Sequence, residues 1–214
     1  DPAVNTVRLP FHPLPQTTSE AVPVINADEW HTAGYAGAGV KVGVLDYSFA
    51  GYDSLLGTEL PASVEVSWAP SIGGPGDNPH GTACAEIVHD VAPAASLYFA
   101  NFSTDLEWYE AVDWLIGRGV DVISCSVGWY ISGDRDGSTG VSSVVQLAEA
   151  AGIVWVQSCG NFAEQHWAGP FTDADADRWQ DFSSSPVVGY NAITASEGDE
   201  VWVRLGWDDP WGSA

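Results

Sequence analysis

The sequence predicts an α/β domain in which a parallel β-sheet is covered by helices on both faces. Two observations lead to this fold class. Short apolar runs alternate with amphipathic segments of about 10–15 residues between residues 27 and 157, an alternation typical of parallel sheets with helical crossovers. Polar side chains directly follow several of these apolar runs, and the carboxyl ends of parallel strands are where such folds bind ligands.

The first 26 residues contain five prolines and are predicted to form an extended arm on the surface of the domain. Residues 27–34 favour a short helix that Gly34 can end. The first strand is predicted at residues 40–45, an apolar run that ends at Asp46.

The remaining strands and helices are predicted from the same alternation of apolar runs and amphipathic segments. Thr104 and Glu107 form a T-x-x-E capping box, so a helix is expected to begin there, and Gly117 and Gly119 are expected to end it. The other helices are predicted at residues 80–90 and 141–151, and the other strands at residues 97–100, 120–127 and 153–157. Inward positions are predicted at Trp108, Val112, Leu115 and Ile116, and at Val144, Val145, Leu147, Ala148 and Ala151.

After Asn161 the pattern changes. Residues 163–186 are irregular and acidic, and strands are predicted at residues 191–195 and 201–207. We therefore divide the chain into the arm at residues 1–26, the α/β domain at 27–200, and the start of a further β-rich segment or inserted domain at 201–214. In this interpretation the sheet is incomplete at its C-terminal end.

The charge balance excludes several classes of partner. Six Lys and Arg face 29 Asp and Glu, which gives a net charge of −23 among 214 residues. Nucleic acids and anionic membrane surfaces are not expected partners, because both require clustered basic side chains. The negative charge is best interpreted as a feature that keeps the protein in solution. Adaptation to high salt and a preference for basic substrates are the more specific alternatives.

Three polar side chains stand where chemistry is expected. Asp46 ends a predicted strand, His80 begins a predicted helix, and Asn161 follows another strand. Each feature alone is common in turns and helix caps. Their order along a predicted parallel sheet is more specific. A nucleotide-binding domain is a weak alternative, because no G-x-G-x-x-G follows the strand at 40–45.

These stretches resemble the subtilases, the subtilisin-like serine peptidases, over residues 26–161. The most specific match is H-G-T-x-x-A at residues 80–85, and S-x-G-N matches at 158–161. Residues 121–128 resemble the family strand that borders the substrate cleft. The resemblance implies a three-layer α/β/α fold and a chain order of Asp, His and Ser.

The resemblance also implies roles for individual residues. His80 would be the general base, Asp46 would orient its imidazole, and Asn161 would donate to the oxyanion. Two backbone segments would line the substrate cleft. One would add the substrate as a strand and the other would form the facing wall of the pocket; their residues are Ser126, Val127 and Gly128, and Ser158, Cys159 and Gly160.

Two features depart from the family pattern. Tyr47 and Ser48 follow Asp46 where the family has Ser or Thr and then Gly, and Asp53 is the alternative carboxylate. No Gly-Thr-Ser, the start of the family's G-T-S-x-A nucleophile turn, occurs anywhere in the chain. We expect the nucleophile beyond residue 214, on a C-terminal remainder of the peptidase; a catalytically silent binding module is the alternative.

The three cysteines are expected to be buried free thiols. Cys84 should share a helix face with His80, because it lies four residues further on. A disulfide between Cys125 and Cys159 is the less favoured alternative.

No cofactor is expected to be required. Asp173, Asp175 and Asp177 alternate in a loop and could hold a structural calcium, although a solvated acidic loop is the preferred interpretation. The expected activity is that of a secreted serine endopeptidase of broad specificity that acts on polypeptides.

Overall fold

A computed structural model describes residues 21–129, 140–161, 167–184, 186–201 and 203 of the chain. Its centre is a five-stranded sheet in the order β2-β3-β1-β4-β5, and every neighbouring pair is parallel. The predicted parallel sheet is thus confirmed. The strands are β1 (Lys41–Asp46), β2 (Glu65–Ser67), β3 (Ser96–Asn101), β4 (Val122–Cys125) and β5 (Val154–Gln157).

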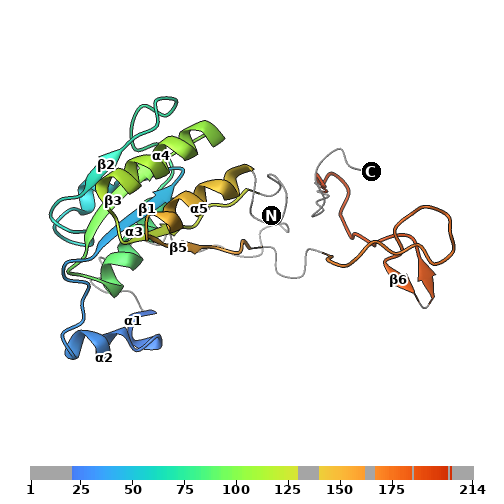
Figure 1. Ribbon diagram of the computed structural model, residues 1–214, viewed down its shortest axis with the longest axis horizontal. Helices are drawn as coiled ribbons and strands as arrows, with labels where there is room; N and C mark the ends of the chain where they lie inside the picture. Colours follow the sequence, from blue (N-terminus) through green and yellow to red (C-terminus); the bar gives the residue numbers. More distant parts are fainter. Residues whose placement is uncertain (1–20, 130–139, 162–166, 185, 202, 204–214) are drawn as a thin grey trace, which may run out of the picture.

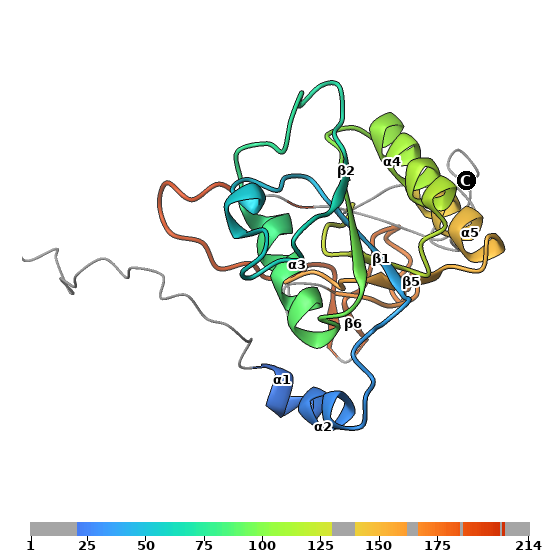
Figure 2. The same ribbon diagram turned by 90° about the vertical axis from the view of Figure 1, so that its left-hand side faces the viewer.

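Helices cover both faces of the sheet (Figures 1 and 2). α3 (His80–Val91) packs on one face, and α4 (Asp105–Arg118) and α5 (Ser143–Ala150) pack on the other. The three-layer α/β/α arrangement implied by the sequence is therefore present. It places the carboxyl ends of β1, β4 and β5 at one edge of the sheet, where a parallel fold forms its ligand site.

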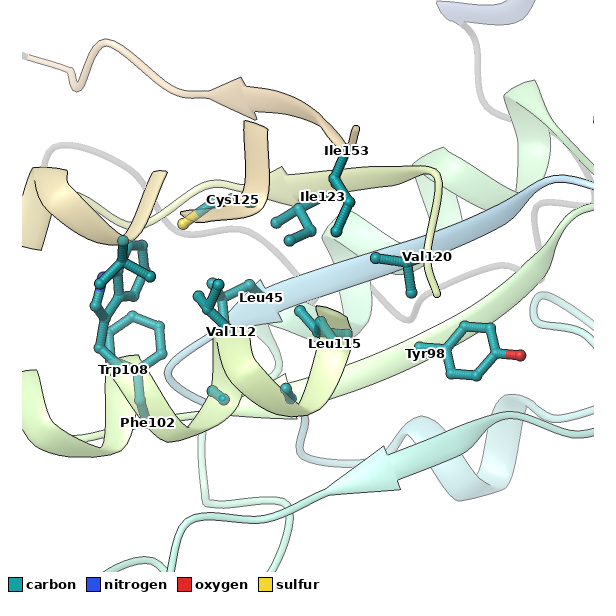
Figure 3. Close-up of a cluster of buried hydrophobic side chains, with 14 residues drawn as sticks. Leu45, Tyr98, Phe102, Trp108, Val112, Leu115, Val120, Ile123, Cys125 and Ile153 are labelled. Carbon is teal, nitrogen blue, oxygen red and sulfur yellow. The ribbon is translucent and has the colours of Figure 1, made fainter. Parts of the chain in front are cut away.

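Two apolar clusters hold these layers together, because the side chains of β1 alternate between the faces. Leu45 joins Leu115 and Ile123 beneath α4, where all three are fully buried (Figure 3). Its neighbour Val44 faces the other way and packs with Phe99 in the cluster beneath α3. A strand buried on both faces explains the uninterrupted apolar run before Asp46.

The α4 helix begins and ends as its sequence predicts. The Glu107 amide donates to Thr104 Oγ1 at 3.2 Å, and Gly119 ends the helix with a left-handed φ of 64°. Gly117, which was also expected to end the helix, lies inside it. Trp108, Val112 and Leu115 are buried, as predicted for the inward face.

Sequence reasoning was wrong about the end of the N-terminal arm and about β2. Residues 21–24, assigned to the arm, form the short helix α1 (Ala21–Val24). The short helix predicted at residues 27–34 is present as α2 (Ala27–Thr32). The rest of the arm, residues 1–20, lies outside the described residues. β2 was missed because it has only three residues and its first, Glu65, is exposed and charged.

The inward face of α5 was predicted too broadly. Val144 and Ala148 are buried, but the side chain of Leu147 is 57% exposed and Ala151 is also exposed. The physical reason is that α5 packs beside β5, which has no further neighbour in the described sheet. Only one row of α5 side chains therefore finds a surface to cover.

The C-terminal part of the described chain is mostly irregular. The strand predicted at residues 191–195 is absent, and the side chain of Ile193 is exposed. Instead β6 (Ser183–Ser184) and β7 (Val187–Val188) form a short antiparallel pair, which lies well away from the main sheet in Figure 1. The strand predicted at 201–207 falls almost entirely outside the described residues. Within the described part of the chain, no helix has the length and apolar character needed to cross a membrane.

Candidate active site

Asp46 and His80 form a hydrogen-bonded pair at the carboxyl edge of the sheet. His80 Nδ1 lies 2.8 Å from Asp46 Oδ2 and 3.0 Å from Oδ1. The carboxylate is fully buried, whereas the imidazole is 42% exposed. An Nδ1–H that donates to the carboxylate leaves Nε2 of the neutral ring free to accept a proton. The pair thus places a base at the surface and its orienting anion beneath it.

Gly81 brings His80 this close to the strand. A side chain at residue 81 would meet the Ser48 carbonyl oxygen at 2.5 Å and Asp46 Cβ at 2.7 Å, so only glycine fits. The Gly81 amide donates instead to the Ser48 carbonyl at 2.9 Å. The His-Gly pair of the motif therefore has a steric cause, since the glycine lets α3 begin against the end of β1.

Hydrogen bonds of Thr82 and of the residues before α3 fix the start of this helix against the end of β1. Thr82 Oγ1 donates to the Ala50 carbonyl at 3.0 Å, and Ala50 in turn donates its amide to the Asn78 carbonyl. The Asn78 side chain accepts the amide of His80 at 2.9 Å. These contacts fix the first turn of α3 in relation to the loop that follows β1, so the imidazole is held in place by backbone on both sides.

The buried environment of Asp46 disfavours the charged form of its carboxyl group. Burial raises the pKa of the Asp46 carboxyl, while the hydrogen bond and charge of His80 and the backbone amides of Tyr47 and Ser48 lower it; the net direction is upward. The Tyr47 amide donates to Oδ1 at 2.8 Å. His80 is thus the side chain that compensates the buried anion, which binds the two residues into one unit.

Tyr47, which departs from the family pattern, has a clear place in the site. Its ring stacks on the His80 imidazole, with ring centroids 5.5 Å apart and an interplanar angle of 25°. Sequence reasoning identified the departure but not this contact, because a residue next to the carboxylate gives no signal of stacking on a side chain 33 positions away. The alternative carboxylate, Asp53, does not contact His80; it is exposed and accepts from the Ser54 amide.

Cys84 lies beside the pair, as its spacing from His80 predicts. One ligand atom from each of Asp46, His80 and Cys84 lies within 4.8 Å of the others. Burial raises the pKa of the Cys84 thiol, and a hydrogen bond with Ser126 lowers it. The thiol is only half-buried, which corrects the expectation of full burial. Cys84 thus lies close to His80 and is hydrogen-bonded to Ser126, the first residue of the segment predicted to pair with the substrate.

The other two cysteines differ from each other. Cys125 is buried in β4 and donates to the Val127 carbonyl, and burial raises its pKa to about 12. Cys159 is exposed, contrary to the expectation of a buried thiol, because it follows the edge strand β5. Both are free, so the alternative of a disulfide between them is absent from the structure.

The predicted substrate segments follow the ends of β4 and β5. The backbone amide of Ser158 donates to the Cys125 carbonyl, and Gln157 Nε2 donates to the Val127 carbonyl at 2.8 Å. Ser126 and Val127 are half-buried and Gly128 is exposed. Ser158, Cys159, Gly160 and Asn161 are all exposed, and the Asn161 side chain makes no hydrogen bond to any described residue.

A pocket of about 390 Å³ opens beside the pair. Tyr47 forms one of its walls, and Phe102 and Trp129 form another, with stacked rings whose centroids are 6.2 Å apart. The remaining lining residues are Ser48, Ile72, Gly76, Asp77, Ser103, Val127 and Gly128. Sequence reasoning assigned Val127 and Gly128 to the substrate cleft but gave the others no place in a pocket, since they lie in aperiodic segments that follow β1, β3 and β4 or precede α3.

The acidic loop brings its three carboxylates together. Oxygen atoms of Asp173, Asp175 and Asp177 lie within 4.8 Å of one another, so they could hold a cation. Their observed contacts are local, because Asp173 accepts from the amides of Asp177 and Arg178. Such contacts are typical of a turn.

The chain resembles proteins of known kind over most of its length. A profile described as "Subtilase family" matches residues 37–199. Subtilisin DY of Bacillus licheniformis is 34% identical over 158 residues, which cover 68% of this chain and 56% of the relative. Subtilisin E of Bacillus subtilis (strain 168) is 31% identical over 167 residues, covering 70% of this chain and 42% of the relative. The chain thus spans about half the length of these relatives.

A solved structure shares the fold. The crystal structure of a lanthipeptide protease superposes with a TM-score of 0.52 at 21% identity, and the match covers 66% of this chain and 45% of that one.

Proposed function

The chain belongs to the subtilase family, and we propose that it forms the Asp-His part of a serine endopeptidase that hydrolyses polypeptides. The observation that carries the proposal is the pair in which His80 Nδ1 lies 2.8 Å from the buried Asp46 carboxylate. In this role Asp46 holds the imidazole in the tautomer that leaves Nε2 basic. His80 then takes the proton of a nucleophile and later returns it to the leaving amine.

The oxyanion donor is assigned to the Asn161 side chain. It follows β5 at the same edge of the sheet as Asp46, and it is exposed and unpaired within the described residues. An amide that donates to the tetrahedral intermediate has to be free in the resting enzyme. Ser158, Cys159 and Gly160 precede Asn161 and would form the wall that faces the substrate.

Ser126 and Gly128 are the residues that would pair with the substrate backbone. Successive carbonyls of an extended segment point to opposite sides. The Val127 carbonyl accepts from Gln157 and therefore faces β5. The backbone groups of Ser126 and Gly128 then face the opposite side, where a peptide can be added as a strand.

The nucleophile is proposed to lie outside this chain, on a longer form of the protein that is secreted. This is supported by the absence of a Gly-Thr-Ser from the 214 residues and by the partial coverage of the relatives. Calcium is not assigned a role in the chemistry, and the acidic loop at residues 173–177 is kept as a candidate for a structural ion only.

Labelling with a serine-directed phosphonate tests the proposal. The chain of residues 1–214 should stay unlabelled, whereas the longer form should be labelled once, at a serine beyond residue 214. His80→Ala should abolish this labelling, and Asp113→Asn, an exposed change on α4, should not. Labelling of a serine within residues 1–214 would contradict the proposal that the nucleophile lies outside this chain. A longer form that binds peptides but is never labelled would favour the silent binding module.

A further inference from the structure

Three of the ten described residues that line the pocket beside His80 are aromatic. Tyr47 and the stacked pair of Phe102 and Trp129 supply its walls, and Tyr47 also stacks on the His80 imidazole. A substrate side chain in this pocket would therefore contact Tyr47, the residue whose ring stacks on His80. Two features of its lining, one charge and one fixed loop, indicate what that side chain is.

Asp77 is the one charged residue among the described residues that line the pocket. Its side chain is exposed, and within the described residues it takes part in no hydrogen bond or ion pair. Burial raises the pKa of Tyr47, and the negative charges of Asp46 and Asp77 raise it further. The Asp77 carboxylate is therefore close enough to Tyr47 to interact with it electrostatically. The described Lys and Arg side chains lie elsewhere. Lys41 starts β1 and Arg118 ends α4, both at the opposite edge of the sheet, and Arg178 belongs to the acidic loop.

The loop that carries Asp77 is held in place by buried polar side chains. Asn101, which is 1% exposed, accepts from the Ala69 amide at 2.7 Å and donates to the Gly74 carbonyl at 2.9 Å. The Glu107 carboxylate accepts both the amide and the hydroxyl of Ser71. Asp77 is therefore presented by a braced loop, and little ordering is required when a ligand binds.

The same loop is also tied to the residue after Tyr47. The Ser48 hydroxyl donates to the Pro75 carbonyl at 3.2 Å and accepts the Asn78 amide at 2.8 Å. Asp77 is thus fixed between two anchored residues, on a segment bonded to the turn that orients His80. The distance between the charge and the reacting bond is set by the fold rather than by a free loop.

We propose that this pocket selects a Lys or Arg side chain of the peptide substrate, with the aliphatic stem packed between Tyr47 and Trp129 and the cation paired with Asp77. The assignment rests on the proposed peptidase function. Long basic side chains combine an apolar stem with a charged head, and their cations are attracted to aromatic faces. A neutral aliphatic side chain would leave Asp77 without a partner, and an acidic one would be repelled by it.

Internally quenched peptides test this assignment in the full-length protein. The peptides carry Lys, the uncharged norleucine or Glu, scanned through the positions around the scissile bond. At one position the ratio of kcat/KM for Lys to that for norleucine should be about fivefold, as expected for a partly exposed ion pair. Asp77→Asn should bring this ratio close to one, and Asp77→Lys should favour Glu. Asp113→Asn, which removes the same charge from exposed α4, should leave the ratio unchanged.

Two results would overturn the assignment: the absence of a Lys preference at every position, or a preference that survives Asp77→Asn. Failure of the peptidase function gives a different result, because no peptide is then cleaved. In that case fluorescence titration with the same peptides still decides. Tighter binding of the Lys peptide that is lost in Asp77→Asn supports the pocket, whereas equal binding of all three peptides refutes it.

Discussion

The two ends of the candidate active site stand on very different parts of the sheet. Asp46 and His80 lie where β1 is paired on both sides and buried on both faces, and Leu45 and Ile123 nearby are 0% exposed. Asn161 follows β5, the last strand of the described sheet, where Val154 and Val156 are 59% and 53% exposed. We call the first region the closed half and β5, with the segment up to Asn161, the open edge.

This difference shows which part of the chemistry the described fold can organise alone. The closed half fixes a buried carboxylate against an imidazole and braces it with the loop before α3. At the open edge no other described strand pairs with β5 and its valines are exposed, although natural sheets normally cover or pair such an edge. These residues thus preorganise the proposed base, whereas the proposed oxyanion donor follows a strand that the described residues leave uncovered on one side.

Asp46→Asn tests the closed half and should have the largest effect. In the longer, active form kcat should fall by about 10⁴, because an amide holds the imidazole in the wrong tautomer. Stability should move the other way. Burial raises the pKa of Asp46 above its ordinary 3.8, so the folded protein binds this proton more tightly than the unfolded chain does. Its stabilising contribution is present at low pH and is lost as pH rises from 3.8 through the raised folded value.

Urea unfolding of the wild type and of Asp46→Asn across this pH range measures the effect on stability. The variant should be the more stable protein at neutral pH and should lack this part of the pH dependence. An Asp46→Asn protein that is less stable at neutral pH would show that the pair with His80 outweighs the burial of the charge.

Asn161→Ala tests the open edge. In the active form kcat should fall by about 10²–10³, with KM nearly unchanged, because an oxyanion donor acts mainly in the transition state. Asn191→Ala, at another exposed asparagine, is the matched control and should have normal kcat. A near-normal kcat for Asn161→Ala would remove this residue from the mechanism.

Cys84 allows a chemical test of the packing around the pair. In a Cys159→Ser background, which removes the exposed thiol, a bulky mercurial should react with Cys84 and abolish most of the activity by displacing His80. Reaction should be slow at neutral pH, since burial raises the pKa of this thiol. Adding Cys84→Ser should make the enzyme resistant. Persistent inhibition of this double variant would place the sensitive thiol elsewhere.

Glu107→Gln probes the brace of the closed half. Loss of the charged acceptor for Ser71 and Ser103 should cost about 1–2 kcal/mol of unfolding free energy. The hydrogen bonds, that from Ser71 first, lower the pKa of Glu107 below its ordinary 4.5. Its contribution is therefore present above 4.5 and is lost as pH falls through the folded value. Acid unfolding curves should converge for wild type and variant, and Glu110→Gln on the same helix serves as the control.

The closed half was the more predictable region from sequence. An apolar run before Asp46, a glycine after His80 and the capping box at Thr104 each reflect a local constraint, and each is seen in the structure. Leu147 shows the limit of such reasoning. Its spacing predicts burial, but whether a surface lies beneath it depends on how far the sheet extends.

The pocket was less predictable for a related reason. Asp77 and Trp129 are brought together by the loop before α3 and by the exit from β4, and neither segment has a period that sequence analysis can use. Glu107 was identified as part of a helix cap, yet its contact with Ser71, 36 residues away, depends on the tertiary fold. Local signals thus located the hydrogen-bonded pair of Asp46 and His80, while its surroundings required the structure.

The smallest expected effect is that of a substitution at Val156, whose burial reports whether another part of the protein covers β5. In residues 1–214 the side chain is 53% exposed, so Val156→Ala should change the unfolding free energy by no more than about 0.5 kcal/mol. Ile123→Val, a similar truncation in the closed half, should cost about 0.5–1.5 kcal/mol, because it leaves a space in a packed core. In the longer form a strand or helix that covers β5 would bury Val156, and its truncation should then cost at least as much as that of Ile123. Urea unfolding of both variants in both lengths gives the comparison. If Val156→Ala remains as mild in the longer form, nothing covers β5, and the expectation that residues beyond 214 complete this edge of the sheet is wrong.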